Sequence, residues 1–557
     1  MKVKFWSGDI ETKGGFGGKF LIGGLFDGRK YFSFSNINDF MNFLLEIEGT
    51  VFFHYLDFDI RVILEWCLNH KIELKTNPII SGDKRIISWK INNLTLRDSF
   101  ILTQSSLGDL ATSFHLADKK LTVKDYHFSA DTPRLRRYLK RDVIILHQSM
   151  NKFFDFIGWE NFKKRTIASI SMAKFKEIDL QSYKRIVESP IYADTNEFLR
   201  EAYFSGYYAT FQDKIDDVER NTYKIDVNSY YAHSMRVNFF PWGGVIKTRN
   251  QNEIISLLDK GKLGVIEAKA IIPPGLKIGF LPYKTENGVQ YPISGNITGK
   301  WTSSEILRAK QIGYEFKFKK AIFWQFQDKL FFKYISRLSH IKEKSTGAKR
   351  AIAKQLLVSL YGKFAQKRDI SKIRRTDYPF PGHLYLDDKM TISEEKKYIR
   401  TPYSHPEISI FTTAYARIFL YDFCEKAGWE NIYSIIADSI ILRTNMTSSF
   451  RKKWIHPTKV GKFKIVSEIE RAIILGRGIY ALKDRNTKEM IRNQGGLKEY
   501  NKLLTFDDFE RAAKKKNKIW NQYNNLKRQK TVYSFLKGKS KIREEVKVSR
   551  KVKIKTS

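Results

Sequence analysis

Short stretches in which apolar and polar residues alternate are interleaved, over residues 1–150, with longer stretches of helical spacing. Alternation is the period of a half-buried strand, whereas apolar residues three and four apart form one face of a helix. Strands mixed with helices in this way predict an α/β domain. The predicted elements are, in order, a strand at 3–12, two strands at 19–34 joined by an Asp27-Gly28 turn, a strand and helix at 50–70, a hairpin at 85–100, and a helix at 132–154 with Pro133 near its start.

A second pattern begins near residue 222, after a polar and mainly helical stretch at 151–220. It again mixes strands and helices, and it ends in a Lys-rich tail from about 510 that is predicted to be partly helical. The predicted elements are a strand and helix at 221–235, strands at 264–273 and 279–284, a helix at 351–367, a hairpin at 383–393, and a long helix at 408–428.

Length and charge narrow the class of protein. A chain of 557 residues is too long for one core, so two to four domains are expected. The net charge of +40 predicts a polyanionic partner, with nucleic acid as the first candidate and an anionic membrane surface as the second. No apolar run reaches the roughly 18 residues that a membrane-spanning helix needs, which argues against a membrane.

Cysteine and histidine usage excludes two further classes. The chain has two cysteines, Cys67 and Cys424, which lie far apart in apolar surroundings. They form no disulfide framework and are typical of a reducing compartment inside a cell. The ten histidines show no HExxH or CxxC…H spacing, so zinc is not expected.

A single carboxylate interrupts the apolar stretch YSIIADSIILRT at 433–444. Burying a carboxylate is costly unless it is paired or binds a cation. On this stretch alone, the simpler interpretation is a strand that ends, with Asp438 and Ser439 in a turn.

A first set of acids is spread over the N-terminal third. Asp9 and Glu11 lie two apart, so on a strand both point to one face. Tyr138 and Asp142 lie one helical turn apart, and Asp59 stands near a helix start. Each has an ordinary alternative: an exposed turn for Asp9 and Glu11, an N-cap for Asp59, and a surface salt bridge for Asp142. Together they could hold two cations about 4 Å apart and activate water, which the tyrosine would orient.

A second set could bind a nucleoside triphosphate. Asp226 ends one strand, and Asp438 would be the opposing ligand from another. Between them, a predicted helix carries cations and an aromatic at spacings of three or four, which suits contacts to phosphates and a base. The alternative is a solvated amphipathic surface helix. The residues of this stripe are Arg350, Lys354, Leu357 and Tyr361.

In their order, these motifs resemble family B DNA polymerases, most closely the protein-primed branch of linear bacteriophages and linear plasmids. The resemblance rests on DIET at 9–12, FHYLDFD at 53–59, SSLGDL at 105–110, YLKRD at 138–142, YFSG at 203–206, DVNSYY at 226–231, KQLLVSLYG at 354–362 and FTTAYAR at 411–417. The chain departs from the family pattern at Tyr55, Ala232 and Val358, which stand in place of Asn, Pro and Asn. Motif C, usually DTDS, reads IADS with Ile436 in place of the first acid, and the KxY motif reads Gly478-Ile479-Tyr480 beside Arg477.

The resemblance implies a multidomain α/β and α+β chain, in which a ribonuclease H-like exonuclease precedes a right-hand polymerase with insertions. The implied boundaries are the exonuclease at 1–185, the first palm segment at 186–265, insertion region 1 (terminal-protein-region-like) at 266–335, fingers at 336–365, insertion region 2 (a strand-displacement hairpin) at 366–408, the second palm segment at 409–495, and thumb with basic tail at 496–557.

The resemblance also implies roles for individual residues, with two Mg²⁺ ions per site for which Mn²⁺ could substitute. Polymerisation would use Asp226, Val227 and Asp438 around metal, and Arg350, Lys354, Tyr231 and Tyr361 on the dNTP. Proofreading would use Asp9, Glu11, Asp59, Asp142 and Tyr138, of which Asp9, Glu11 and Asp142 would bind metal. DNA would contact Phe58, Ser106, Leu107, Tyr203, Gly206, Ser359, Gly362 and Tyr480.

The leading hypothesis is therefore a DNA-directed DNA polymerase with 3′–5′ exonuclease activity, protein-primed and strand-displacing, that replicates a linear viral or plasmid genome. Expected partners are template-primer DNA, dNTPs, a terminal protein and a single-stranded-DNA-binding protein, in the host cytoplasm if the chain is viral. Two alternatives stay open: a primer-dependent family B repair polymerase, and a polymerase-derived DNA-binding protein weakened by the loss of a motif C acid. A nuclease alone would leave residues 200–557 unexplained.

Overall fold

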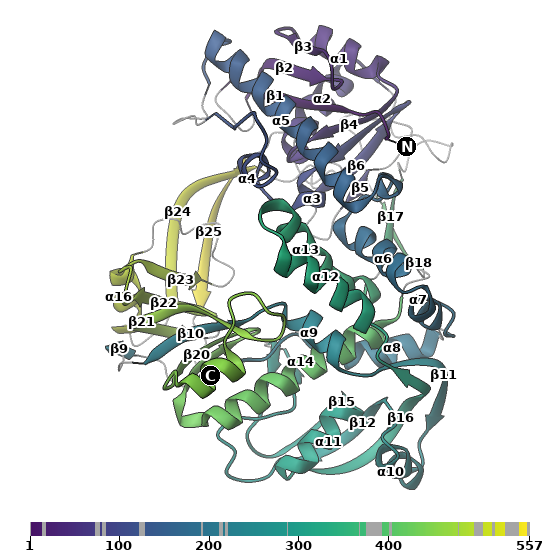
Figure 1. Ribbon diagram of the computed structural model, residues 1–557, viewed down its shortest axis with the longest axis vertical. Helices are drawn as coiled ribbons and strands as arrows, with labels where there is room; N and C mark the ends of the chain where they lie inside the picture. The colour runs from purple at the N-terminus through teal and green to yellow at the C-terminus, as the bar shows by residue number, and fades with distance from the viewer. Residues whose placement is uncertain are drawn as a thin grey trace.

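The computed structural model describes most of the chain (Figure 1). The α/β domain expected at the N-terminus and the second α/β pattern are both present, and mixed helices and sheets run through the whole molecule. The described residues are 2–13, 18–72, 78–80, 85–121, 128–190, 193–210, 215–217, 221–286, 288–366, 368–374, 393–399, 404–476, 478–494, 505–514, 519–529 and 545–553.

Within those residues, seven strands form an N-terminal sheet in the order β3-β2-β1-β4-β7-β6-β5. The pairs β1–β4 and β4–β7 are parallel, and the other neighbours are antiparallel. The strands are β1 (Trp6–Thr12), β2 (Phe20–Phe26), β3 (Tyr31–Phe34), β4 (Gly49–Phe53), β5 (Ile79–Ile80), β6 (Ile86–Ile91) and β7 (Leu94–Asp98).

Helices cover both faces of this sheet. α1 (Ile37–Glu46) and α2 (Leu56–Asn69) share one apolar cluster with it, and α5 (Pro133–Ile157) packs through a different cluster on the opposite face. The Ser7 hydroxyl donates to the Val143 carbonyl of α5, 2.8 Å away, so odd-numbered residues of β1 face α5. This orientation decides where Asp9 and Glu11 point.

A second sheet lies in the C-terminal half, where eight described strands pair in the order β23-β22-β21-β10-β20-β19-β8, with β9 beside β21. Its central strands β21, β10, β20 and β19 pair antiparallel. The strands are β8 (Tyr208–Thr210), β9 (Ile215–Asp217), β10 (Thr222–Val227), β19 (Ile432–Ile436), β20 (Ser439–Arg443), β21 (Phe463–Gly476), β22 (Ile479–Asp484) and β23 (Met490–Gln494).

Helices join the two sheets, and two of them, α12 and α13, stand between the N-terminal domain and the second sheet in Figure 1. Short helices connect the remaining segments. The helices are α3 (Phe100–Thr103), α4 (Leu107–Ser113), α6 (Ile167–Ile178), α7 (Leu180–Val187), α8 (Ala193–Glu201), α9 (Tyr230–Val237), α12 (Phe332–Lys344), α13 (Gly347–Phe364), α14 (Pro406–Ala427) and α15 (Ser448–Trp454), with 3₁₀ turns at Trp159–Asn161 and Trp429–Asn431.

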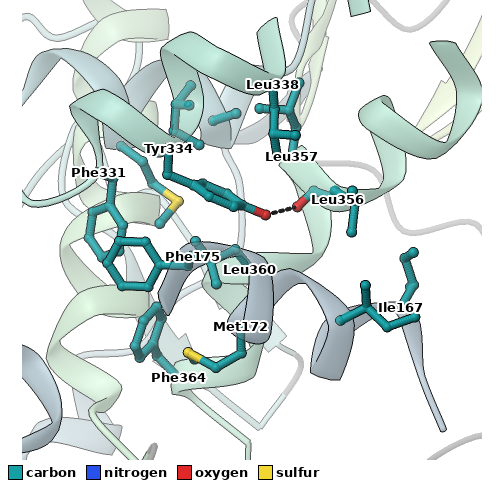
Figure 2. Close-up of a cluster of buried hydrophobic side chains, with 14 of the residues drawn as sticks. Ile167, Met172, Phe175, Phe331, Tyr334, Leu338, Leu356, Leu357, Leu360 and Phe364 are labelled. Carbon is teal, nitrogen blue, oxygen red and sulfur yellow. Dashed lines mark hydrogen bonds between the residues drawn. The ribbon is translucent and has the colours of Figure 1, made fainter. Parts of the chain in front are cut away.

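One apolar cluster runs from the N-terminal domain into α12 and α13 (Figure 2). At its centre, the Leu356 carbonyl of α13 accepts hydrogen bonds from the Tyr334 and Ser171 hydroxyls, both at 3.1 Å. Phe175 of α6 lies beside Phe331 and Tyr334. A shared core of this kind fixes α13 relative to the N-terminal domain.

A smaller sheet follows the first strand and helix of the second pattern, and in the described chain it has the order β11-β16-β12-β15. Its first strand begins at Phe240, whereas the first insertion region was predicted to span 266–335. The sheet therefore does not coincide with that region, and the predicted domain boundaries stay predictions. The strand expected at 279–284 is wrong except at its end, because only Tyr283–Thr285 is extended into a ladder. The elements are β11 (Phe240–Thr248), α10 (Gln251–Asp259), β12 (Gly264–Ile271), β13 (Tyr283–Thr285), β14 (Gly288–Gln290), β15 (Asn296–Thr302), α11 (Ser303–Ile312) and β16 (Glu315–Asp328).

The last predicted segments are only partly described. β17 (Arg368–Arg374) pairs with β18 (Ser393–Ile399), while the hairpin predicted at 383–393 lies, apart from Ser393, outside the described residues. In the Lys-rich tail, α16 (Phe506–Lys514) is helical as expected, but the described residues beyond it form the antiparallel strands β24 (Ile519–Gln529) and β25 (Glu545–Lys553). The described residues agree with a partly helical tail, but the strands β24 and β25 were not predicted.

Candidate functional site: two carboxylate centres

The N-terminal acids converge on one cavity. Asp9 and Glu11 project from β1 towards α5, which carries Tyr138 and Asp142 on one face. Asp59 lies in the first turn of α2, where its Oδ1 accepts a hydrogen bond from the Ile10 backbone N–H, 2.9 Å away. It is buried and is not the N-cap that was considered as an alternative. All five side chains line a cavity of about 780 Å³.

Burial and mutual repulsion make the acids of this cavity hard to ionise. Burial raises the pKa of Asp9 well above its ordinary value, and the neighbouring charges of Glu11, Asp59 and Asp142 raise it further. Burial and the Asp142 charge raise the pKa of Glu11 to about 7. Burial also raises the pKa values of Asp59 and Asp142. A cation among these oxygens would relieve the repulsion.

Lys120 is a member of this cavity that sequence reasoning missed. Its ammonium contacts the Asp142 Oδ2 in a short ion pair and donates to the Tyr138 hydroxyl, 2.9 Å away. Lys120 therefore offsets some of the Asp142 charge and fixes the tyrosine. The sequence held no signal for it, because Lys119 and Lys120 read as ordinary surface charge on a basic protein.

The cavity offers the donor type that Mg²⁺ prefers, which is carboxylate oxygen. Among the described residues, no group of three or more His, Cys, Asp or Glu side chains is already gathered tightly enough to hold a metal ion. The Asp142 Oδ1 is nonetheless buried without a hydrogen-bond partner within the described ranges. An unpaired carboxylate oxygen beside three further acids fits a divalent cation, which would replace the contact with Lys120.

The cavity wall contains the residues expected to contact single-stranded DNA. Phe58, Ser106 and Leu107 line it, and Ser106 is the N-cap of α4, where its hydroxyl accepts from the Asp109 backbone N–H at 3.1 Å. Tyr55 stands beside them with φ 66° and stacks on Phe100, 4.1 Å between centroids. Tyr55 is 43% exposed, which leaves one aromatic face open at the cavity.

The second centre lies on the second sheet, where Asp226 on one strand meets Asp438 in a turn next to the neighbouring strand. Asp226 stands opposite Ser439 of β20, and Asp438 lies in the two-residue turn between β19 and β20. The Asp438 carbonyl accepts from the Val227 N–H, 2.9 Å away. The turn considered for Asp438 from the sequence is thus present, and it brings that acid beside Asp226 while leaving its side chain exposed.

A cross-strand row organises this face. Lys464, Asp226, Ser439 and Ile436 stand directly opposite one another on β21, β10, β20 and β19. Directly opposed residues point to the same face of an antiparallel sheet. The Lys464 ammonium lies 3.3 Å from Asp226 Oδ2, and the Ser439 hydroxyl is buried with no partner among the described residues.

The electrostatics of this face resemble those of the first centre. Burial raises the pKa of Asp438, and the Asp226 charge raises it further, while Lys464 and Lys224 oppose the shift. Two carboxylates that repel each other beside an unpaired hydroxyl fit a divalent cation. Lys464 was missed by sequence reasoning, since only the pairing of β10 with β21 brings it to Asp226.

Aromatic residues close one side of this centre. The rings of Tyr231 and Tyr361 lie 4.5 Å apart between centroids. A Cβ on Gly206 would lie 3.1 Å from the Cα and Cβ of Ala437 and 3.2 Å from the Tyr231 hydroxyl. Gly206 therefore lets the chain segment after α8 approach the turn that carries Asp438.

Cationic side chains from α12 and α13 lie on the side of the Asp226 centre that faces these helices. Lys354 is exposed on α13, and Arg350 donates to the Lys342 carbonyl at 3.2 Å. The Lys342 ammonium is buried and donates to the Ser229 hydroxyl at 3.0 Å, next to the end of β10. Burial, together with the charges of Arg350 and Lys354, lowers the pKa of Lys342 to about 8. Lys342 was also missed, because a lysine at the end of a surface-like helix carries no signal of burial.

The remaining predicted DNA contacts are less closely grouped. Tyr480 is buried in a separate cluster with Ile474 and Leu482, and the Lys224 ammonium lies 5.7 Å from its ring centroid. Ser359 and Gly362 lie on α13 near Tyr361, and Gly362 is exposed with no atom within 4 Å of an added Cβ. Tyr203 is half-buried beside the loop that contains Gly206, and Arg477 lies outside the described residues.

A family profile described as DNA polymerase type B, organellar and viral, matches residues 124–428, more than half of the 557-residue chain. The chain belongs to this family. The predictions of a family B DNA polymerase and of a mixed α/β multidomain fold are thereby confirmed.

Named relatives agree with this assignment. The DNA polymerases of Bacillus phage Nf and Streptococcus phage Cp-1 are 24% and 25% identical over 503 and 499 residues, which cover 84% and 83% of this chain and 83% of each relative. A solved structure of phi29 DNA polymerase with primer-template DNA and incoming nucleotide matches with a TM-score of 0.78 at 20% identity and covers 100% of both chains. This last likeness concerns the fold. Among the described helices, none is both long and apolar enough to cross a membrane.

Proposed function

We propose that this type B polymerase extends a DNA primer at the centre formed by Asp226 and Asp438. The observation that carries the proposal is the approach of Asp226 on β10 to Asp438 in the β19–β20 turn, where the Val227 N–H donates to the Asp438 carbonyl. Magnesium ions held there would lower the pKa of the primer 3′-hydroxyl and neutralise charge on the triphosphate.

The residues around this centre have distinct tasks in the proposal. Lys354 and Arg350 bind the triphosphate from α13, with Lys342 as a third cation that is buried beneath them. Tyr231 packs under the sugar of the incoming nucleotide, and Tyr361 packs on its base. Because burial keeps the Lys342 ammonium away from water, a phosphate would be a favourable partner for it.

The N-terminal cavity is proposed as a 3′–5′ proofreading site. Asp9, Glu11 and Asp142 would hold divalent cations, and Tyr138, fixed by Lys120, would orient the attacking water. The cavity lies apart from the Asp226 centre, on a different sheet, so a frayed primer end would have to move from one to the other. The exposed face of Tyr55 and the α4 N-terminus would hold that end.

The partners proposed are template-primer DNA and dNTPs, which the net charge of +40 would attract through phosphate contacts. Protein priming by a terminal protein, strand displacement by the insertion at 366–408, and cooperation with a single-stranded-DNA-binding protein are further proposals from the family resemblance. Several relatives are encoded by bacteriophages, and both cysteines are buried and free, so the interior of a host cell is the proposed location.

Primer extension tests the polymerase proposal. The wild type is expected to extend a labelled primer on a circular template with Mg²⁺, and Asp226→Asn and Asp438→Asn are expected to lose at least about a thousandfold in rate. Lys247→Gln, which removes one charge on β11 away from both centres, serves as the control. Unimpaired extension by either Asn variant would refute the assignment, and binding of DNA without extension by the wild type would favour the alternative of a weakened DNA-binding protein.

A labelling reaction tests protein priming separately. The wild type is incubated with a terminal protein from the same genome and with labelled dATP, without any DNA primer. Transfer of labelled dAMP to a protein hydroxyl is expected, and its absence under conditions that support primer extension would favour the primer-dependent alternative.

A further inference from the structure

A tyrosine outside every motif considered above extends the cross-strand row of the polymerase centre. Tyr208 of β8 stands directly opposite Ile436 of β19. Ile436 in turn stands opposite Ser439, and Ser439 opposite Asp226. Since directly opposed residues of antiparallel strands share a face, the Tyr208 side chain lies on the face from which Asp226 projects.

The surroundings of Tyr208 connect it to the groups that would handle the primer and the nucleotide. Its side chain is half-buried. A phenol keeps its proton at neutral pH, so the Tyr208 hydroxyl is available as a hydrogen-bond donor. Gly206, two residues before Tyr208, lies so close to the Tyr231 hydroxyl that an added Cβ would be 3.2 Å from it, and the Tyr231 and Tyr361 rings lie 4.5 Å apart between centroids.

The backbone next to Tyr208 is held closely against the turn of Asp438. The Ala437 N–H donates to the Tyr207 carbonyl at 2.8 Å, and Ala437 itself adopts φ 56°. The close approach of Gly206 to Ala437 holds the other side of the same segment. The backbone beside Tyr208 is therefore tied to the turn that carries Asp438.

The row has an apolar member at the position where the family pattern carries an acid, because Ile436 replaces the first residue of motif C. We propose that Tyr208 is a positioning residue of the polymerase centre, whose hydroxyl steadies the primer terminus beside Asp438 in place of the polar group absent at Ile436. This inference rests on the proposed role of Asp226 and Asp438. A protonated phenol supplies one donor and no negative charge, so Tyr208 orients a partner and does not replace a metal ligand.

Substitution of the hydroxyl alone tests the inference. Tyr208→Phe keeps the ring and is expected to lower kcat for primer extension about tenfold, the effect of one hydrogen bond to a charged partner, with the KM for dNTP unchanged. Degradation of single-stranded DNA is expected to stay at the wild-type rate. Tyr223→Phe is the matched control, because Tyr223 lies on β10 three residues before Asp226 and hence on the opposite face.

Restoring a hydrogen-bond donor at position 436 supplies the second arm of the test. In Tyr208→Phe with Ile436→Asn, the new amide N–H donor is expected to recover most of the lost kcat, so that the two changes are not additive. A wild-type kcat in Tyr208→Phe, an equal loss of extension and degradation, or an additive double variant would each overturn the inference. If Asp226→Asn also extends primers normally, the proposed function of the Asp226 centre is refuted, and the result for Tyr208 is explained by that failure alone.

Discussion

The ion pair between Arg417 and Glu305 is buried on both sides, with each side chain 1% exposed, and it connects α14 to α11. The Arg417 guanidinium donates to Glu305 Oε1 at 2.6 and 3.1 Å and to the carbonyls of Phe204 and Ser205 at 3.0 and 2.8 Å. It therefore secures the segment that leads to Gly206 and the polymerase centre. We expect Arg417→Met to destabilise the fold and to impair extension.

The expected magnitude follows from the unpaired charge. Removing one partner of a buried pair costs about 3–5 kcal/mol, because the other charge is left without compensation. In Arg417→Met, Glu305 keeps only its bonds from the Thr302 N–H and hydroxyl, at 3.1 and 2.9 Å. Adding Glu305→Gln removes that charge while preserving an acceptor for Thr302, so the double variant is expected to regain about 2 kcal/mol relative to Arg417→Met.

Urea denaturation followed by tryptophan fluorescence measures these differences. Arg308→Met is the control, because Arg308 pairs with the partly exposed Asp422 and Glu425, and such pairs contribute about 1 kcal/mol or less. A loss below about 1 kcal/mol in Arg417→Met, or strict additivity in the double variant, would contradict this reasoning.

Two further predictions concern the N-terminal cavity. Lys120→Met removes the ammonium that holds the Tyr138 hydroxyl, so degradation of single strands should slow by about ten- to a hundredfold while primer extension is unchanged; equal slowing of both reactions would argue against a local role. The raised pKa of Glu11 disfavours its charged form, so in EDTA its contribution to stability is complete below pH about 4.5 and is lost as the pH rises through about 7. Melting temperatures of the wild type and Glu11→Gln should therefore converge at low pH and separate at high pH, with Mg²⁺ narrowing the gap, and parallel curves would refute this.

The sequence predicted which residues share a face when they lie in the same helix or strand. The spacing of Asp9 and Glu11 places them on one face of β1, and that of Tyr138 and Asp142 on one face of α5, because each pair lies within a single regular element. The stripe of Arg350, Lys354, Leu357 and Tyr361 lies on α13 for the same reason, but Leu357 is buried in the apolar core.

Residues whose roles depend on strand order could not be found in this way. Lys464 meets Asp226 only because β21 pairs with β10, and Tyr208 joins the row only because β8 pairs with β19. Lys342 lies on a helix that reads as amphipathic, and its burial arises from packing against residues more than a hundred positions away. The tail strands β24 and β25 were not predicted, because lysines are depleted in strands and the pairing between the two segments outweighs this local preference.

The central claim is that two separate carboxylate centres perform synthesis and degradation. An end-labelled primer annealed to a longer template, incubated with Mg²⁺ with and without dNTPs, reports both reactions in one gel. We predict that Asp9→Ala with Glu11→Ala extends the primer but does not shorten it, and that Asp226→Ala shortens it but does not extend it. If either variant lost both reactions while remaining folded, the account of two independent centres would be contradicted.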